Sequence, residues 1–202
     1  MDIEKTLKNL NKRGFKAVYF KDGAAAADYI LSLVPAGASA GFGGSRTLAE
    51  LKIPSLLNEN GRIVYHRGTT ENMSAAEIMK NSMSADWFFL SANALTENGE
   101  IINTDGRANR VGASIYGPGN VVVVAGVNKI VKNLAAAMKR IKTVAAPLNA
   151  KRLEKSPPCV FGTPDCMNCG ASDTICCVTA IHHRPTYGRN FVVIIVGETL
   201  GF

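Results

Sequence analysis

The stretch DWFFLSANALTENGEIINTDGRANR, residues 86–110, decides the fold that this sequence predicts. It begins with the apolar run Trp87-Phe88-Phe89-Leu90, the pattern of a buried strand, and then turns polar at Ser91. Asn98-Gly99 supplies the positive φ angles of a tight hairpin turn. Polar and charged side chains follow up to Arg110. Such a change is typical of the mouth of a parallel sheet, where α/β proteins bind ligands. A solvated hairpin between core strands is the alternative.

Strands alternate with helices along the rest of the chain. Apolar runs predict strands at residues 15–20, 38–42, 63–66, 120–126 and 191–196. Helical patterns occupy residues 1–13, 24–33, 74–83, 127–144 and 148–153, with Pro147 as an interruption. The run at 120–126 is apolar on both faces, which favours a buried parallel strand. The order predicts one α/β domain over residues 1–202 with a mostly parallel sheet.

Composition bounds the class of protein. The chain of 202 residues is 47% hydrophobic, which is enough for a sizeable core. Its net charge of +7 suits an acidic ligand or partner, but with only 7% aromatic residues and no dense basic patch we expect no nucleic-acid binding. No apolar run reaches the ~20 residues of a membrane span. Residues 1–14 show no signal-peptide pattern, so a cytoplasmic location is expected.

Two further turns carry polar groups after predicted strands. Gly43-Gly44-Ser45-Arg46-Thr47 follows the strand at 38–42 and opens a helix with Ser45 or Thr47 as its cap, an arrangement that favours anions. Asn128 and Lys129 follow the strand at 120–126, where a lysine can hold a negative ligand. The alternative for the turn at 43–47 is a plain tight connection between strand and helix, since no standard nucleotide-binding motif is present. The alternative for Lys129 is a surface lysine near a helix start.

The five cysteines lie between residues 159 and 177, within a segment at 155–189 that reads as a Cys-rich flap before the last strand. Cys166-x2-Cys169 can ligate one metal from a tight turn, and Cys159 and Cys176 would complete four thiolates. Four thiolates suit zinc or an iron–sulfur cluster equally. Reduced thiols in a compact flap, or a redox pair at 166 and 169, are the alternatives. Cys177 is the spare thiol, and His182 and His183 are expected on the surface.

Several of these motifs together resemble the lactate-utilization (LUD) domain family over nearly the whole chain. They are GFGGSRTL (41–48), SANALTENGEIINTDGRANRVGA (91–113), VVVVAGVNKIV (121–131), AAPLNAKRL (145–153), the cysteine run (158–176) and VGETLGF (196–202). The resemblance implies a three-layer α/β sandwich similar to sugar-phosphate isomerases and coenzyme A transferases. Some members take part in oxidising L-lactate to pyruvate with protein partners, one of them an iron–sulfur protein. A homo-oligomer is a further possibility. Arg107-Ala108 departs from the family, where Thr-Gly is usual.

The resemblance also implies site residues. The expected catalytic residues are Glu97, Asp105 and Lys129. The expected ligand-binding residues are Gly43, Gly44, Ser45, Thr47, Asn93, Asn109, Arg110, Asn128 and Glu198. The matched thiols are Cys159, Cys166, Cys169 and Cys176.

Three functions compete at this point. The first is a component of lactate oxidation that binds a small anionic substrate or cofactor and holds a metal or cluster. The second is a transferase or isomerase, with Glu97 or Glu198 as nucleophile or base and the turn at 43–47 holding phosphate or coenzyme A. The third is a non-catalytic subunit whose metal flap docks an electron-transfer partner.

Overall fold

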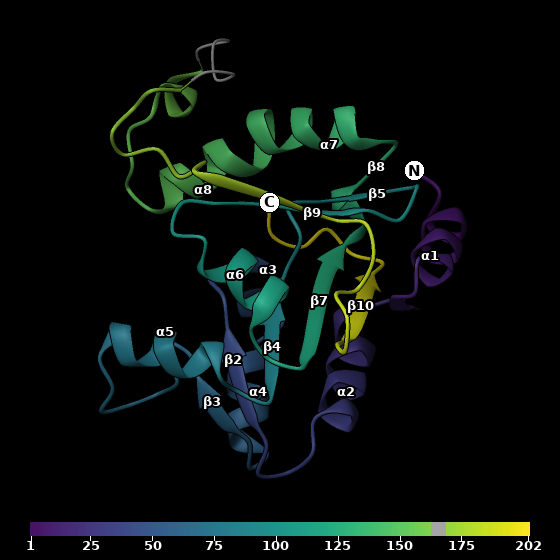
Figure 1. Cartoon of the computed structure of the whole chain (residues 1–202), viewed down its shortest axis with the longest axis vertical. Helices are drawn as coiled ribbons and strands as arrows, with labels where there is room; N and C mark the ends of the chain where they lie inside the picture. Colours follow the sequence, from purple (N-terminus) through teal and green to yellow (C-terminus); the bar gives the residue numbers. More distant parts are fainter. Residues whose placement is uncertain (163–168) are drawn as a thin grey trace.

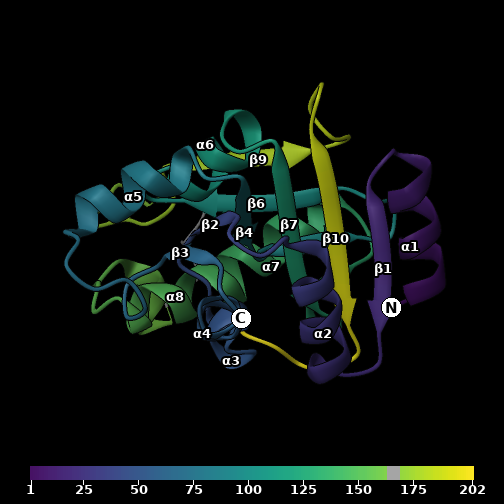
Figure 2. The same ribbon diagram turned by 90° about the horizontal axis from the view of Figure 1, so that it is seen from below.

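A parallel sheet forms the centre of the computed structural model, which describes residues 1–162 and 169–202 (Figures 1 and 2). Within these residues its strand order is β1-β10-β7-β4-β2-β3, and every neighbouring pair is parallel. The strands are β1 (Lys16–Phe20), β2 (Ser39–Phe42), β3 (Ile63–Tyr65), β4 (Trp87–Leu90), β7 (Asn120–Gly126) and β10 (Asn190–Val196). The predicted α/β fold with a mostly parallel sheet is therefore confirmed.

Helices cover one face of this sheet, as Figure 2 shows for α2 to α4. They are α2 (Gly23–Leu33), α3 (Arg46–Glu50) and α4 (Ile53–Glu59), while α5 (Ala75–Met83) lies beside β2 and β3. Ile30 of α2 and Leu57 of α4 belong to the same apolar cluster as Val122 and Ile194 of the sheet. Alternate residues of β7 and β10 point to the two faces, so these strands need apolar side chains at every position.

A second sheet covers much of the opposite face, together with α1 (Ile3–Lys12) and α6 (Asn109–Tyr116). Its order in the described residues is β8-β5-β6-β9, and its strands run across those of the large sheet (Figures 1 and 2). The strands are β5 (Ala94–Thr96), β6 (Ile101–Asp105), β8 (Ile130–Val131) and β9 (Val178–His182). Leu95 and Ile101 pack with Val121 and Val123 of β7.

The hairpin expected at Asn98-Gly99 joins β5 to β6, which pair antiparallel. It is a buried element, because every residue of β5 and most of β6 are shielded from solvent. Over the other side of the small sheet lie α7 (Leu134–Arg140), a π-helical turn (Ile141–Ala145) and α8 (Ala146–Arg152) (Figure 1). The two strands of the hairpin are therefore part of the core, while Asn98 at the turn is exposed.

The helix predicted over residues 127–144 is wrong in its first part. The chain forms a 3₁₀ turn (Val127–Lys129), then strand β8, and α7 starts only at Leu134. Asn133 caps α7 by accepting a hydrogen bond from the Ala136 N–H at 3.0 Å, which fixes the start of the helix there. Pro147 does not interrupt, because it occupies the first turn of α8, where a missing N–H has no cost.

The Cys-rich flap contributes two elements that the sequence did not indicate. A 3₁₀ helix spans Pro158–Phe161, and β9 pairs antiparallel with the whole of β6. Alternate residues of β9 face opposite sides, since Thr179 and Ile181 are exposed whereas His182 is buried. Within the described residues, no helix is both long and apolar enough to cross a bilayer.

Candidate functional site

The polar turns that are distant in sequence lie along one edge of the large sheet. Because β10, β7, β4 and β2 are parallel neighbours, their carboxyl ends share that edge. Gly43 follows β2, Ser91 follows β4, Lys129 follows β7 by one turn, and Glu198 follows β10. The edge of a parallel sheet is where α/β folds hold ligands. The convergence expected from the sequence is therefore present.

Lys129 is the most unusual residue of this edge, because it is buried with only 3% of its surface exposed. Its Nζ donates hydrogen bonds to Thr47 Oγ1 at 2.8 Å and to Ser91 Oγ at 2.9 Å. In the part of the chain that the structure describes, no carboxylate forms an ion pair with it. The Lys129 pKa is lowered from 10.5 to about 7, first by burial and then by the charges of Arg140 and Arg110, while the charge of Glu50 acts in the opposite direction. The alternative of a surface lysine is therefore wrong.

The segment Leu200-Gly201 covers this amine. The Asn128 side chain binds this segment twice: it accepts a hydrogen bond from the Leu200 N–H at 3.2 Å and donates one to the Gly201 carbonyl at 3.3 Å. Glu50 Oε2 accepts from the Gly201 N–H at 2.7 Å, and Thr47 Oγ1 donates to the Leu200 carbonyl at 3.3 Å. Gly201 has φ +57, and a Cβ at this position would lie 2.7 Å from Thr47 Oγ1. Glycine is therefore needed for so close an approach.

Arg110 and Asp105 form a second polar group at the same edge. The Arg110 Nη2 lies 2.5 Å from Asp105 Oδ1, and it also donates to the Thr104 carbonyl at 3.1 Å and to Asn93 Oδ1 at 3.4 Å. Asp105 Oδ2 accepts from the Val111 N–H at 3.0 Å and so anchors the first turn of α6. A Cβ on Gly43 would meet the Arg110 Cγ at 2.4 Å, so the expected glycine serves the close packing of this arginine.

Arg140 is a site residue that the sequence analysis missed. From α7 it donates to two backbone carbonyls, that of Asn128 at 3.1 Å and that of Asn93 at 2.6 Å. It therefore ties the turn after β4 to the turn after β7. The basic residues at 129–142 resemble those of a surface helix. Arg140, however, lies three positions after buried Ala137 and so on the same side of the helix, and this spacing was the available signal.

The remaining predicted residues lie apart from this group. Glu97 faces α1, where its carboxylate accepts from Lys5 Nζ at 3.1 Å and from the Asp2 N–H at 3.2 Å. The hydrogen bond from Lys5 lowers the Glu97 pKa. Ser45 caps α3 by accepting from the Leu48 N–H, as expected.

Three further predicted residues lie at the same edge of the sheet but belong to neither the Lys129 group nor the Arg110–Asp105 pair. The side chain of Glu198 is exposed, with Oε2 near Gly23 at the start of α2. Gly44 has open space around it, and Asn109 begins α6.

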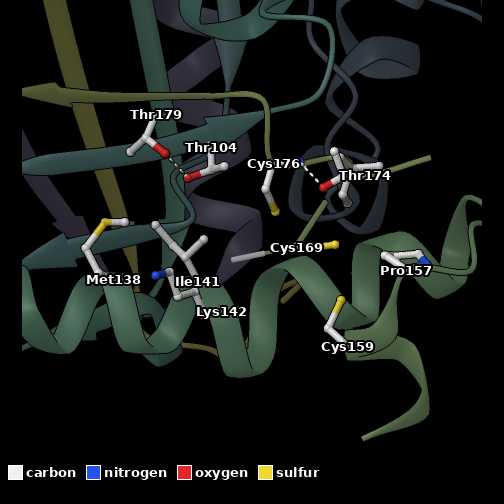
Figure 3. A pocket seen from close by; sticks show the side chains of 11 residues that line it. Thr104, Met138, Ile141, Lys142, Pro157, Cys159, Cys169, Thr174, Cys176 and Thr179 are labelled. Carbon is white, nitrogen blue, oxygen red and sulfur yellow. Dashed lines mark hydrogen bonds between the residues drawn. The ribbon is translucent and has the colours of Figure 1, made fainter. Parts of the chain in front are cut away.

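Three of the four predicted thiols line one cavity of about 240 Å³ (Figure 3). Cys159, Cys169 and Cys176 approach it from separate parts of the flap, and the helical segment that carries Met138 and Ile141 forms its floor. Cys166 lies outside the described residues. Across residues 1–162 and 169–202, no group of three ligands is close enough to hold a single metal ion. Cys177 does not line the cavity.

The thiol cavity adjoins the polar edge of the sheet. A small neighbouring pocket is lined by both Asn93 and Cys176, and it shares Thr104 and Ile175 with the larger cavity. The backbone N–H of Cys177 donates to the Asp105 carbonyl at 3.0 Å. The flap is therefore fixed beside the Arg110–Asp105 pair.

His182, which was expected on the surface, is 5% exposed, and that expectation is wrong. Strand β9 turns its ring inward, where Nε2 lies 3.3 Å from Ser114 Oγ and the ring packs on Phe191. Burial lowers the His182 pKa. His183, the next residue, is exposed as expected.

Comparison with known proteins supports this fold. The LUD domain model matches residues 3–196. A DUF162 family protein from Deinococcus radiodurans has a similar structure, with a TM-score of 0.53 and 12% sequence identity over 96% of this chain and 94% of that chain. Ribose 5-phosphate isomerase A from Neisseria gonorrhoeae is 16% identical over 55% of this chain and 54% of that chain, with a TM-score of 0.38. No curated protein sequence matches the chain.

Proposed function

The chain belongs to the LUD domain family, and from this membership we propose that it binds a small 2-hydroxy or 2-oxo acid during the oxidation of lactate to pyruvate. The family itself places the chain in a role related to lactate utilisation. The proposed binding site is the carboxyl edge of the large sheet, around Lys129, Arg110 and Arg140.

The observation that carries the proposal is the buried amine of Lys129 without a carboxylate partner among the described residues. A buried cation is costly unless it is paired, so the site favours an anion from outside the chain. The charges of Arg110 and Arg140 act on the same point, since both lower the Lys129 pKa. A bound carboxylate would reverse that effect and raise this pKa.

The neighbouring residues have positioning roles in this proposal. Thr47 and Ser91 fix the amine, and their hydroxyls also lie 3.3 Å apart within hydrogen-bond distance. Asp105 orients Arg110, while Arg140 holds the two turns that carry Asn93 and Asn128.

Calorimetric titration with pyruvate and L-lactate tests the proposal. Because binding would raise the Lys129 pKa from about 7, the complex should take up protons near pH 7.5. The apparent enthalpy would then change with the ionisation enthalpy of the buffer. The exposed neighbour Lys132 provides the matched control, so Lys132→Met should retain the effect and Lys129→Met should lose it. Absence of binding by either acid would overturn the proposal.

We further propose that the thiol cavity holds an iron–sulfur cluster, with zinc as the competing occupant. Cys159, Cys169 and Cys176 line it, and thiolates are the ligands that both take. A bound cluster would supply one-electron transfer beside the polar edge. The full ligand set would require Cys166, which lies outside the described residues.

Iron and acid-labile sulfide should be measured on protein purified without oxygen. Cys169→Ser should lose both, whereas Cys177→Ser should retain them because Cys177 does not line the cavity. A colourless protein with one equivalent of zinc would contradict the cluster. A cluster without any acid binding would instead favour the non-catalytic electron-transfer subunit.

Among the residues that the structure describes, no contact favours Glu97 as the nucleophile or base of a transferase or isomerase, because its carboxylate is engaged by Lys5 and the Asp2 N–H. The other candidate, Glu198, is exposed beside the start of α2. Replacement of Glu97 by Gln would therefore be expected to weaken the attachment of α1 and to leave acid binding unchanged.

A further inference from the structure

We propose that Lys129 forms a covalent imine with the carbonyl carbon of a 2-oxo acid bound at this edge. The inference rests on the proposed function, since it names how the same site would hold one class of its ligands. It goes beyond binding because it assigns a reaction to one nitrogen atom.

The atoms around the amine leave it free of any carboxylate partner in the described chain. Nζ contacts two hydroxyl oxygens, at 2.8 and 2.9 Å, and no carboxylate oxygen forms an ion pair with it in the described chain. A carboxylate paired directly with Nζ would hold the amine as an ammonium ion, which has no lone pair to attack a carbonyl. In the imine-forming pose the carboxylate of the oxo acid therefore pairs with Arg110 or Arg140, and C2 faces Nζ. Hydroxyls accept from either form of the amine and so leave the neutral form accessible.

The charge state of the amine also suits attack on a carbonyl. Burial and the two guanidinium groups bring the Lys129 pKa to about 7. About half of the molecules would then carry a neutral amine at pH 7. Lysines that condense with carbonyl groups are activated in this way, by desolvation and by a neighbouring cation.

The reaction balances with groups present at the edge. The Nζ lone pair attacks C2 of the oxo acid and forms a C–N bond, while the carbonyl oxygen takes up a proton to give a carbinolamine. Loss of that oxygen as water forms the C=N bond, so one amine and one carbonyl give one imine and one water. The hydroxyls of Thr47 and Ser91 lie close enough to Nζ to pass protons between it and this oxygen.

The acid reaches the amine when Leu200-Gly201 moves. Four hydrogen bonds hold these two residues, and each has a side chain as one partner: two from Asn128, one from Thr47 and one from Glu50. None of them belongs to the backbone ladder of the sheet. Lifting the segment breaks no strand but withdraws the Leu200 side chain from the apolar cluster of the large sheet, and the segment would exclude water again on closing.

Borohydride reduction of the full chain in the presence of pyruvate tests the proposal. Reduction turns an imine into a stable secondary amine, and the expected result is one adduct per chain on the peptide that contains Lys129. Lys132→Met should give the same adduct, and Lys129→Met should lose it. Oxamate, which has the shape of pyruvate but a poorly electrophilic carbonyl, should protect Lys129 from reduction with pyruvate and give no adduct of its own.

Calorimetry on the same samples separates this inference from the proposed function. If pyruvate binds and no adduct forms, or the adduct maps to other amines, the imine is overturned and acid binding stands. If pyruvate does not bind and no adduct forms, both proposals fail. Peptide mapping of the unmutated chain decides the matter even if Lys129→Met does not fold.

Discussion

Lys129 should lower the stability of the fold, and its replacement by methionine should reveal by how much. Methionine keeps the length and the apolar stem of the side chain and removes the amine. The folded chain holds this amine at a pKa of about 7, against 10.5 in the unfolded chain. Between these two values the unfolded chain binds more protons, so the stability of the unmutated protein should rise with pH across this window.

The magnitude follows from the two pKa values. Integration between them gives a cost of about 4 kcal/mol at pH 7 and about 2 kcal/mol at pH 9. Methionine removes this cost but takes a partner from Thr47 and from Ser91, at about 1 kcal/mol each. The variant should therefore be more stable than the parent by about 2 kcal/mol at pH 7 and nearly equal to it at pH 9.

Urea unfolding at pH 7, 8 and 9 measures the difference. The single tryptophan, Trp87, is buried in β4 and provides the fluorescence signal, with a reductant present to keep the thiols unlinked. With a slope of about 2 kcal/mol per molar urea, the midpoint at pH 7 should move up by about 1 M. Lys132→Met, at an exposed position, should leave the midpoint unchanged.

The pH dependence of the difference is the decisive quantity, because other titrating groups are common to both proteins and cancel. If the difference in stability between variant and parent were the same at pH 7 and at pH 9, a buried amine of lowered pKa would be refuted. So would a parent whose advantage over the variant shrinks as the pH rises.

Three other changes should have defined effects. His182→Gln should reduce the loss of stability below about pH 6.5, because the folded chain resists protonation of this buried ring more than the unfolded chain does. Part of the slope should remain, since the pKa of half-buried His66 is also lowered and so are those of carboxylates such as Glu97. Ala108→Gly should raise the thermal midpoint, gaining up to about 1 kcal/mol, since Ala108 has φ +56 where glycine is unstrained. Glu50→Ala should accelerate borohydride trapping with pyruvate, because it frees the Gly201 N–H and loosens the segment that covers Lys129. Glu50→Gln keeps a hydrogen-bond acceptor, so it should accelerate trapping less if this segment limits the access of pyruvate to the amine.

Much of the fold could be predicted because it depends on local patterns. The apolar runs of β4, β7 and β10 are long and bounded by turns, and a strand buried on both faces has no other composition. Their shared edge then follows from the parallel order alone, so Gly43, Ser91 and Lys129 could be brought together before any coordinates were known.

The contacts around the site could not be predicted in the same way. Arg140 donates to backbone carbonyls, and because every residue has a carbonyl, the sequence does not show which ones it binds. The burial of His182 depends on β9, a strand within a segment whose composition is typical of a loop. Glu97 matched a family motif, yet its partners come from α1, about ninety positions earlier in the chain.

The wrong helix prediction at 127–144 and the burial of Lys129 have one cause. The pattern after β7 continues with helical spacing, but Ile130 and Val131 pair with Leu95 and Thr96 and add β8 to the small sheet. This pairing holds the 3₁₀ turn against the edge of the large sheet, where Lys129 points beneath the covering segment. A helix that started at Val127 would have no such restraint, and its first turn would carry the lysine towards solvent. The tertiary pairing that overrides local helix propensity is therefore also what desolvates the amine, and the chemistry proposed for it depends on those two residues of β8.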